Sequence, residues 1–255
     1  MSIHENLARV EEQIESACRR AGRPRAEVKL MAVSKTHPAG LIAEAVAAGL
    51  RLFGENRVQE FQGKAAELTK LGIEVLTSGN ATDPSSANPA TLRRIPVHLI
   101  GHLQSNKAAK AVELFTVIDT LDSLRLAERL NEAARKQDRV LPVLLEVKLS
   151  HEEAKTGLEP NATEFADLLE RLPDLENLRL SGLMTVPPWS EDPETARPYF
   201  VQLRELRERL AALHPRLDFA ELSIGMSNDF AVAIEEGSTY VRIGTALFGK
   251  RPKPA

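Results

Sequence analysis

Hydrophobic and polar residues along the chain follow two periodicities, one helical and one extended. In residues 3–22 apolar side chains recur at spacings of three and four, which predicts an amphipathic helix. That stripe consists of Ile3, Leu7, Val10, Ile14 and Cys18. Residues 28–34, VKLMAVS, are instead almost uninterruptedly apolar, as in a strand buried on both faces of a parallel sheet. The next segment, 40–49, has helical character and ends at Gly49, a residue suited to a C-terminal cap.

The alternation of strand and helix continues along the rest of the chain. The further predicted strands are 51–53, 97–100, 115–118, 141–147, 178–183, 219–223 and 240–243. The further predicted helices are 56–70, 122–137, 162–172, 193–213 and 229–236. Eight strands joined mostly by helices, after one extra N-terminal helix, predict a single α/β domain over residues 1–255, built as a (β/α)8 TIM barrel. An open, doubly wound sheet is the competing arrangement.

Two polar segments interrupt this pattern. Residues 77–94 are rich in Ser, Asn, Thr and Pro and predict an exposed loop. Residues 249–255, GKRPKPA, predict a flexible tail. Neither segment indicates a domain boundary.

Charge and composition exclude several classes of protein. Lys and Arg number 33 against 36 Asp and Glu, a net charge of −3, so no bulk positive charge favours nucleic acid as a partner. The single cysteine, Cys18, excludes an intrachain disulfide and a Cys-rich zinc site. The N-terminal segment lacks the apolar core of a secretory signal, and no apolar run is long enough to cross a bilayer. These features predict a cytoplasmic protein without a membrane partner.

Polar and glycine residues collect where the predicted strands end, which is the active face of such a barrel. Lys35 is the most informative of them, because it follows the first buried strand directly. A lysine amine partly desolvated at such a place has a lowered pKa, and its neutral form is the nucleophile that condenses with an aldehyde. The alternative is a lysine whose stem lies along the strand end while its amine reaches water.

The ends of the last two strands carry glycine and hydroxyl residues together. Gly225, Met226 and Ser227 follow the seventh strand, and Gly244 and Thr245 follow the eighth. Barrels often bind phosphate at these two loops, where glycine admits the anion to the backbone and hydroxyls donate to it. This pairing favours a phosphate site over ordinary turns.

Arg242 lies within the last predicted strand, and two readings of it stay open. It pairs with a carboxylate inside the barrel, or it donates to the nitrogen of a bound pyridine ring and keeps that nitrogen unprotonated, which weakens carbanion chemistry. His98 and His102 are four residues apart without a carboxylate in their motif, so no metal site is predicted.

Six motifs, distributed in order over nearly the whole chain, resemble those of the pyridoxal phosphate homeostasis proteins, which are similar to the barrel domain of bacterial alanine racemase. The motifs are AVSKTHP (32–38), FGENRVQE (53–60), HLIGHLQSNK (98–107), SGLMTV (181–186), LSIGMSNDF (222–230) and GSTYVRIGTALFG (237–249). The resemblance implies the barrel of pyridoxal-phosphate proteins of fold type III, and pyridoxal 5′-phosphate as the cofactor.

The resemblance also implies a role for each candidate residue. Lys35 would carry the cofactor as a Schiff base. Ser227, Gly244 and Thr245, with backbone near Met226, would hold its phosphate. Arg242 would face the pyridine nitrogen, with Asn56 and Met184 near the cofactor. Proteins of this family have no established turnover: they bind, store or deliver the cofactor, with other B6 vitamers and apo-enzymes as possible partners. No catalytic residue is therefore assigned.

A racemase or related fold-type III enzyme is the alternative function. Racemisation needs acid–base groups on both faces of the substrate Cα. In alanine racemases the second group is a tyrosine on a carboxyl-terminal domain of the partner subunit, whereas the tyrosines here are Tyr199 and Tyr240 and the chain ends at residue 255. We therefore expect a monomer without racemase activity. Two departures from the family pattern precede the third strand: Val97 replaces an expected aromatic residue, and segment 77–94 is long.

Overall fold

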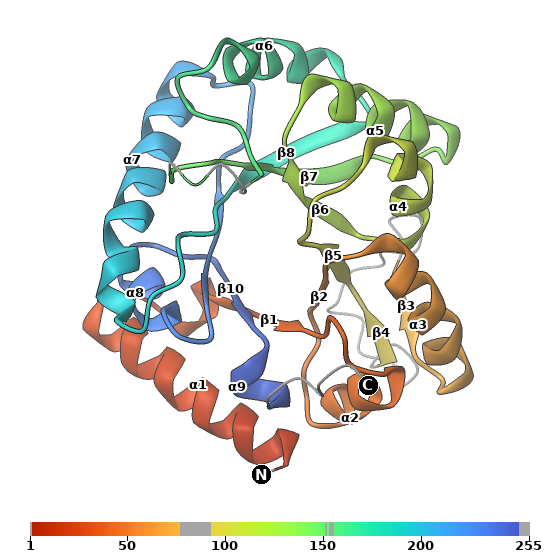
Figure 1. The fold of residues 1–255 in the computed structure, drawn as a ribbon, viewed down its shortest axis with the longest axis vertical. Helices are drawn as coiled ribbons and strands as arrows, with labels where there is room; N and C mark the ends of the chain where they lie inside the picture. The colour runs from red at the N-terminus through yellow and green to blue at the C-terminus, as the bar shows by residue number, and fades with distance from the viewer. Residues whose placement is uncertain (1, 77–92, 151, 153–155, 250–255) are drawn as a thin grey trace.

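The computed structural model describes residues 2–76, 93–150, 152 and 156–249. Within these residues, eight parallel strands close into a barrel in the order β1-β10-β9-β8-β7-β6-β5-β2 (Figure 1). The strands are β1 (Lys29–Val33), β2 (Phe53–Glu55), β5 (Val97–Leu99), β6 (Val117–Leu121), β7 (Leu141–Glu146), β8 (Leu178–Met184), β9 (Glu221–Met226) and β10 (Tyr240–Ile243). The barrel closes where β10 pairs with β1, with Tyr240 opposite Lys29 and Arg242 opposite Met31. Closure confirms the predicted TIM barrel and excludes the open sheet.

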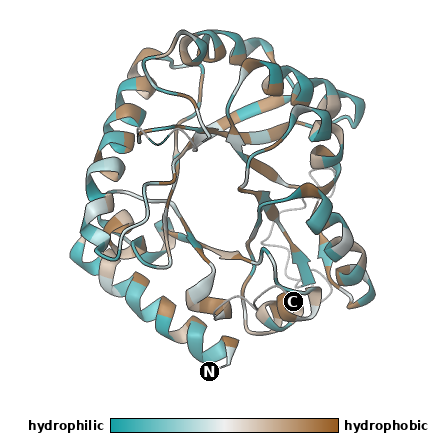
Figure 2. Ribbon diagram, in the orientation of Figure 1, coloured by the Kyte–Doolittle hydropathy of each residue, from teal (hydrophilic) through white to brown (hydrophobic). Residues whose placement is uncertain are grey.

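Helices form a ring around the barrel (Figure 1). They are α1 (Ile3–Arg20), α2 (Ala39–Ala47), α3 (Val58–Lys70), α4 (Ala108–Leu114), α5 (Leu124–Lys136), α6 (Thr163–Arg171), α7 (Arg197–Leu213), α8 (Phe230–Glu235) and α9 (Thr245–Phe248). Short 3-10 helices are η1 (Arg25–Glu27), η4 (Ser105–Lys107), η5 (Leu172–Asp174) and η6 (Pro193–Ala196). The helices carry both hydrophilic and hydrophobic residues, as expected of elements with one face on a barrel and one toward water (Figure 2).

The predicted N-terminal helix is confirmed as α1, which packs against α8 and α9. It begins with a capping box, in which the Glu5 amide donates to Ser2 Oγ at 3.2 Å and the Ser2 amide donates to Glu5 Oε2 at 2.8 Å. Its apolar stripe is buried, apart from Leu7, which is half-buried. The Asn6 side-chain amide donates to the Leu247 carbonyl at 2.8 Å and so joins α1 to α9, beside the mouth of the barrel.

Several predicted boundaries are displaced. The second, fourth and seventh strands begin two residues later than predicted, at Phe53, Val117 and Glu221, because hydrophobicity alone does not fix the register of a short buried strand. Helix α4 and the two-stranded sheet β3 (Glu74–Val75) and β4 (Arg94–Ile95) were not predicted. The buried positions of α4 are mostly alanine, which gives a weak periodic signal.

The predicted cap at Gly49 is confirmed: α2 ends at Ala47, and Gly49 has φ of +110°. Most of the predicted 77–94 loop lies outside the described residues, and its last residue, Arg94, belongs to β4. The predicted tail also lies outside them, apart from Gly249, which caps α9. Val97 is fully buried in β5.

Candidate functional site

All eight predicted cofactor residues lie at or near the carboxyl ends of barrel strands. They follow or end β1 (Lys35), β2 (Asn56), β8 (Met184), β9 (Met226, Ser227) and β10 (Arg242, Gly244, Thr245). These five strands are consecutive around the barrel, in the order β2-β1-β10-β9-β8. Residues up to 210 positions apart in sequence therefore share one arc of the barrel mouth, which is where a bound ligand would lie.

The turn that carries Lys35 is held from both sides. Before it, the Ser34 carbonyl accepts from Lys64 Nζ at 2.9 Å, and Ser34 Oγ donates to Glu55 Oε1 at 2.7 Å. After it, the Thr36 amide donates to Glu60 Oε1 at 2.6 Å, and Thr36 has φ of +67°. A non-glycine residue in the left-handed region stores strain that surrounding contacts must hold. Lys35 itself is half-buried.

Those contacts come from a cluster on β2 and α3 that sequence reasoning missed. Lys64 Nζ lies 2.8 Å from Glu55 Oε1 and 2.7 Å from Glu60 Oε1, and Glu55 is fully buried. Burial raises the pKa of Glu55, which Lys64 opposes. Burial acts in the same direction on Glu60, but Lys64 and the Thr36 amide outweigh it and lower the pKa of Glu60. The i,i+4 spacing of Glu60 and Lys64 was the available signal.

The two predicted phosphate loops meet. Ser227 Oγ accepts from the backbone amides of Gly244 and Ala246, each at 3.3 Å. The first loop turns at Gly225, whose φ is +90° and where an added Cβ would lie 2.6 Å from the Ala233 Cβ. A hydroxyl and backbone amides thus converge on one point, beside the exposed Thr245. Such a convergence suits an anion.

The amide of Met226 is already engaged. It donates to Asp229 Oδ1 at 2.6 Å, which closes the loop between β9 and α8. Burial raises the pKa of Asp229, while this hydrogen bond and the charge of Arg242 act in the opposite direction. The sequence analysis assigned Asp229 no role, although it lies in the quoted motif.

Arg242 is buried, 4% exposed, and forms no ion pair with a carboxylate in the part of the chain that the structure describes. Its Nη1 donates to the Ser223 carbonyl and, at 2.9 Å, to Ser223 Oγ, while Nη2 donates to the Thr185 carbonyl at 2.9 Å. Burial lowers the pKa of Arg242, and Asp119, Asp229 and Glu146 act against this through their charges. The first prediction for Arg242, a direct ion pair with a carboxylate, is therefore not met among the described residues. The second, a contact with a bound pyridine ring, stays a prediction.

Arg242 is the first member of a series of buried, hydrogen-bonded side chains that continues through Ser223. Ser223 Oγ donates to Asp119 Oδ2 at 3.2 Å, and Asp119 Oδ1 lies 2.9 Å from His98 Nδ1. Because a carboxylate only accepts, this histidine nitrogen carries the proton. His102 similarly lies 2.9 Å from Asp122. Among the described residues, no group of three or more potential metal ligands is present.

Asn56 presents an unsatisfied polar atom. Its Oδ1 is buried and finds no hydrogen-bond partner among the described residues. Gly101 packs on it so closely that an added Cβ would lie 2.4 Å from the Asn56 carbonyl oxygen. Met184, at the end of β8, is buried. An orphaned acceptor, a permanently charged guanidinium and an anion-binding loop together fit a polar ring that bears a phosphate.

The chain is similar to known proteins over nearly its whole length. Residues 6–252 match the family described as alanine racemase, N-terminal domain. The pyridoxal phosphate homeostasis protein of Aquifex aeolicus is 42% identical over 251 residues, which are 98% of this chain and 99% of that protein. The protein of the same name from Escherichia coli K12 is 41% identical over 253 residues, 98% of this chain and 97% of the relative.

The chain is also similar in structure to solved proteins. PipY of Synechococcus elongatus, with PLP bound, is 39% identical with a TM-score of 0.77, covering 97% of this chain and all of that one. An alanine racemase of Clostridium difficile has a TM-score of 0.65 at 16% identity, over 99% of this chain and 57% of the racemase, and at that identity the likeness concerns the fold alone. No helix in the described part of the chain is long and apolar enough to cross a membrane.

Proposed function

The chain belongs to the alanine racemase N-terminal domain family, and within it to the pyridoxal phosphate homeostasis proteins, and we propose that it holds pyridoxal 5′-phosphate at the mouth of its barrel. The observation that carries this proposal is the convergence of Lys35, Arg242 and the Ser227–Gly244 contact on neighbouring strands. A relative, PipY, has PLP bound.

Lys35 forms the covalent link in this proposal. Its amine condenses with the cofactor aldehyde to a Schiff base and releases water. The contacts of Ser34 and Thr36 with the cluster of Glu55, Glu60 and Lys64 fix the turn on both sides of Lys35.

The phosphate is held where β9 and β10 end, next to the strand that precedes Lys35. Ser227 and Thr245 donate hydrogen bonds from their hydroxyl groups. The amides of Gly244 and Ala246, which donate to Ser227 Oγ in this structure, lie in position to donate to the phosphate as well. Each charge-assisted hydrogen bond contributes about 1.5–3 kcal/mol.

Arg242 sets the chemistry that the site supports. When bound, the cofactor supplies an electron sink through its pyridine ring, and this sink is strongest when the ring nitrogen is protonated. The Arg242 guanidinium, which donates to Ser223 and Thr185, would donate to that nitrogen and keep it unprotonated. Such an arrangement favours storage of the cofactor over carbanion chemistry.

The relatives are named homeostasis proteins rather than enzymes. We accordingly assign this chain the binding and release of pyridoxal 5′-phosphate without catalytic turnover. Exchange with apo-enzymes or other B6 vitamers, a monomeric state, a single domain and a cytoplasmic location stay predictions.

The phosphate contacts supply the test. Fluorescence titration should show that Ser227→Ala combined with Thr245→Val weakens pyridoxal 5′-phosphate binding by roughly tenfold to ten-thousandfold, because one or two charge-assisted bonds are lost. Binding of pyridoxal, which has no phosphate, should change little. Ser16→Ala, on α1, is the matched control and should leave both affinities unchanged. Equal losses for the two ligands would place the phosphate elsewhere.

A further inference from the structure

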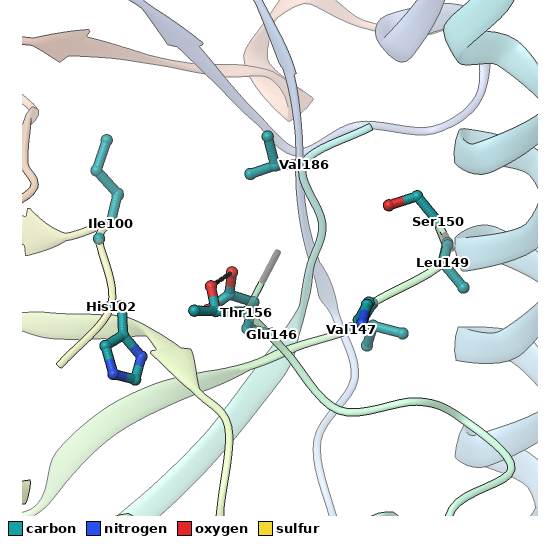
Figure 3. A pocket seen from close by; sticks show the side chains of 10 residues that line it. Ile100, His102, Glu146, Val147, Leu149, Ser150, Thr156 and Val186 are labelled. Carbon is teal, nitrogen blue, oxygen red and sulfur yellow. Dashed lines mark hydrogen bonds between the residues drawn. The ribbon is translucent and has the colours of Figure 1, made fainter. Parts of the chain in front are cut away.

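A pocket lies on the opposite side of the barrel mouth from Lys35. Its volume is about 260 Å³, and it opens where β5, β7 and β8 end (Figure 3). Its polar lining includes His102, Glu146, Lys148, Ser150 and Thr156. None of the eight cofactor residues lines it. In the barrel order, β7 is four strands from β1 in either direction, so this pocket faces the lysine turn across the mouth.

Two buried oxygens in the pocket lack partners. Glu146 is 7% exposed; its Oε1 accepts from Thr156 Oγ1 at 2.7 Å, but its Oε2 has no hydrogen-bond partner among the described residues. Ser150, 8% exposed, likewise has an unpartnered Oγ in the described structure. Figure 3 shows the Glu146 and Thr156 side chains beside each other, joined by this hydrogen bond. Buried polar atoms without partners are costly, and here they border an open volume far larger than one water.

The charged side chains near Glu146 form hydrogen bonds or ion pairs with other residues. His102 lies 2.9 Å from Asp122, and Lys148 lies 3.8 Å from Glu159. Arg242 donates to Ser223 and Thr185 and acts on Glu146 only through its charge. Burial raises the pKa of Glu146, and the charge of Asp122 raises it further, while Thr156, His102 and Arg242 oppose both. Among the described residues, no cationic side chain forms an ion pair with Glu146. A cationic ligand with N–H donors could therefore pair with its free oxygen, Oε2.

We propose that this pocket binds a small nitrogen cation, an ammonium or guanidinium group, through Glu146 and Ser150. Glu146 Oε2 supplies the charge and one acceptor, and Ser150 Oγ supplies a second acceptor. A neutral ligand of the same shape would satisfy the hydrogen bonds without neutralising the buried carboxylate, and so binds more weakly. The proposal does not rest on the cofactor, since the two sets of residues are separate.

Methylguanidinium is a suitable probe, because it carries N–H donors and a permanent charge and does not condense with aldehydes at neutral pH. Calorimetric titration of the full chain should show saturable binding, both with and without pyridoxal 5′-phosphate. N-methylurea, its neutral analogue, should bind at least tenfold more weakly. Absence of saturable binding, equal affinity for the two probes, or loss of binding when the cofactor is present would overturn the proposal.

Variants identify the residues. Glu146→Gln should weaken methylguanidinium binding roughly tenfold to a hundredfold, since a charge-assisted hydrogen bond is lost. Glu170→Gln, an exposed glutamate on α6, is the matched control and should have no effect. Ser150→Ala removes only a hydroxyl and should weaken binding about twofold to tenfold, which keeps the test decisive if the Glu146 variant folds poorly. Full affinity in both pocket variants would contradict the assignment.

Discussion

Replacing Lys64 by methionine tests the cluster that positions Lys35. Lys64 is 8% exposed and donates to Glu55, Glu60 and the Ser34 carbonyl. Methionine keeps most of the apolar stem but leaves Glu55 buried without a cation. Removal of one partner of a buried ion pair costs about 3–5 kcal/mol.

The size of the effect follows from the protonation of Glu55. An orphaned carboxyl escapes its burial by taking up a proton, and from an ordinary pKa near ~4.3 this costs about 3.7 kcal/mol at pH 7. The lost hydrogen bond to the Ser34 carbonyl adds about 1 kcal/mol. We therefore expect Lys64→Met to lower the free energy of unfolding by about 5 kcal/mol, and to weaken cofactor binding because the Lys35 turn is released.

The pH dependence has a defined sign. In the variant the folded-state pKa of Glu55 rises further above its unfolded value, so its protonated form adds stability that is fully present below the unfolded pKa. That stability is lost as pH rises through the folded pKa. The difference in unfolding free energy between wild type and variant should therefore narrow as pH falls from 7 toward 5.

Urea denaturation followed by circular dichroism measures these differences. Lys136→Met is the control, because its ion pair with Glu132 is exposed and screened by solvent, so its loss should matter little. Adding Glu55→Gln to Lys64→Met should recover part of the loss, since the orphaned charge is removed. A Lys64 variant as stable as the Lys136 control, or a loss independent of pH, would refute this account of the turn.

Two further predictions concern the phosphate loop and the absence of turnover. Gly225→Ala should lower the free energy of unfolding by about 1–3 kcal/mol in thermal denaturation and weaken cofactor binding, because Gly225 has φ of +90° and the new Cβ would meet Ala233. The control is Gly40→Ala on α2, which has open space around it and should be neutral or stabilising. A stable Gly225 variant would show that the loop relaxes freely. Single-enantiomer amino acids incubated with the cofactor-loaded protein should keep their chirality on a chiral column, since in the proposed site Arg242 would weaken the electron sink. Racemisation at a rate above that of free cofactor would favour the racemase alternative.

Sequence patterning predicted the barrel because each strand is a short apolar run between amphipathic helices. It also predicted which strand ends carry glycine, hydroxyl and lysine residues. Strand β2 was misplaced by two residues, because its residues include Gly54 and the fully buried Glu55, which does not read as a strand residue. Its burial depends on Lys64, which the chain brings back from α3.

The supporting residues were harder to predict for the same reason. Asp119, Ser223 and His98 lie on three different strands and form one buried chain beneath Arg242 only after the barrel closes. Likewise, nothing in the order of residues around Glu146 indicates that its second oxygen stays without a described partner. Contacts of this kind depend on distances between residues on different strands, and the hydrophobic periodicity of the sequence gives no information on those distances.

Borohydride reduction of the protein loaded with pyridoxal 5′-phosphate, followed by peptide mapping, tests the central claim most directly. Reduction fixes the cofactor to the amine that holds it. The account predicts one modified peptide, carrying the phosphopyridoxyl group on Lys35, and none in Lys35→Ala. A label on another lysine, or undiminished labelling in that variant, would contradict it.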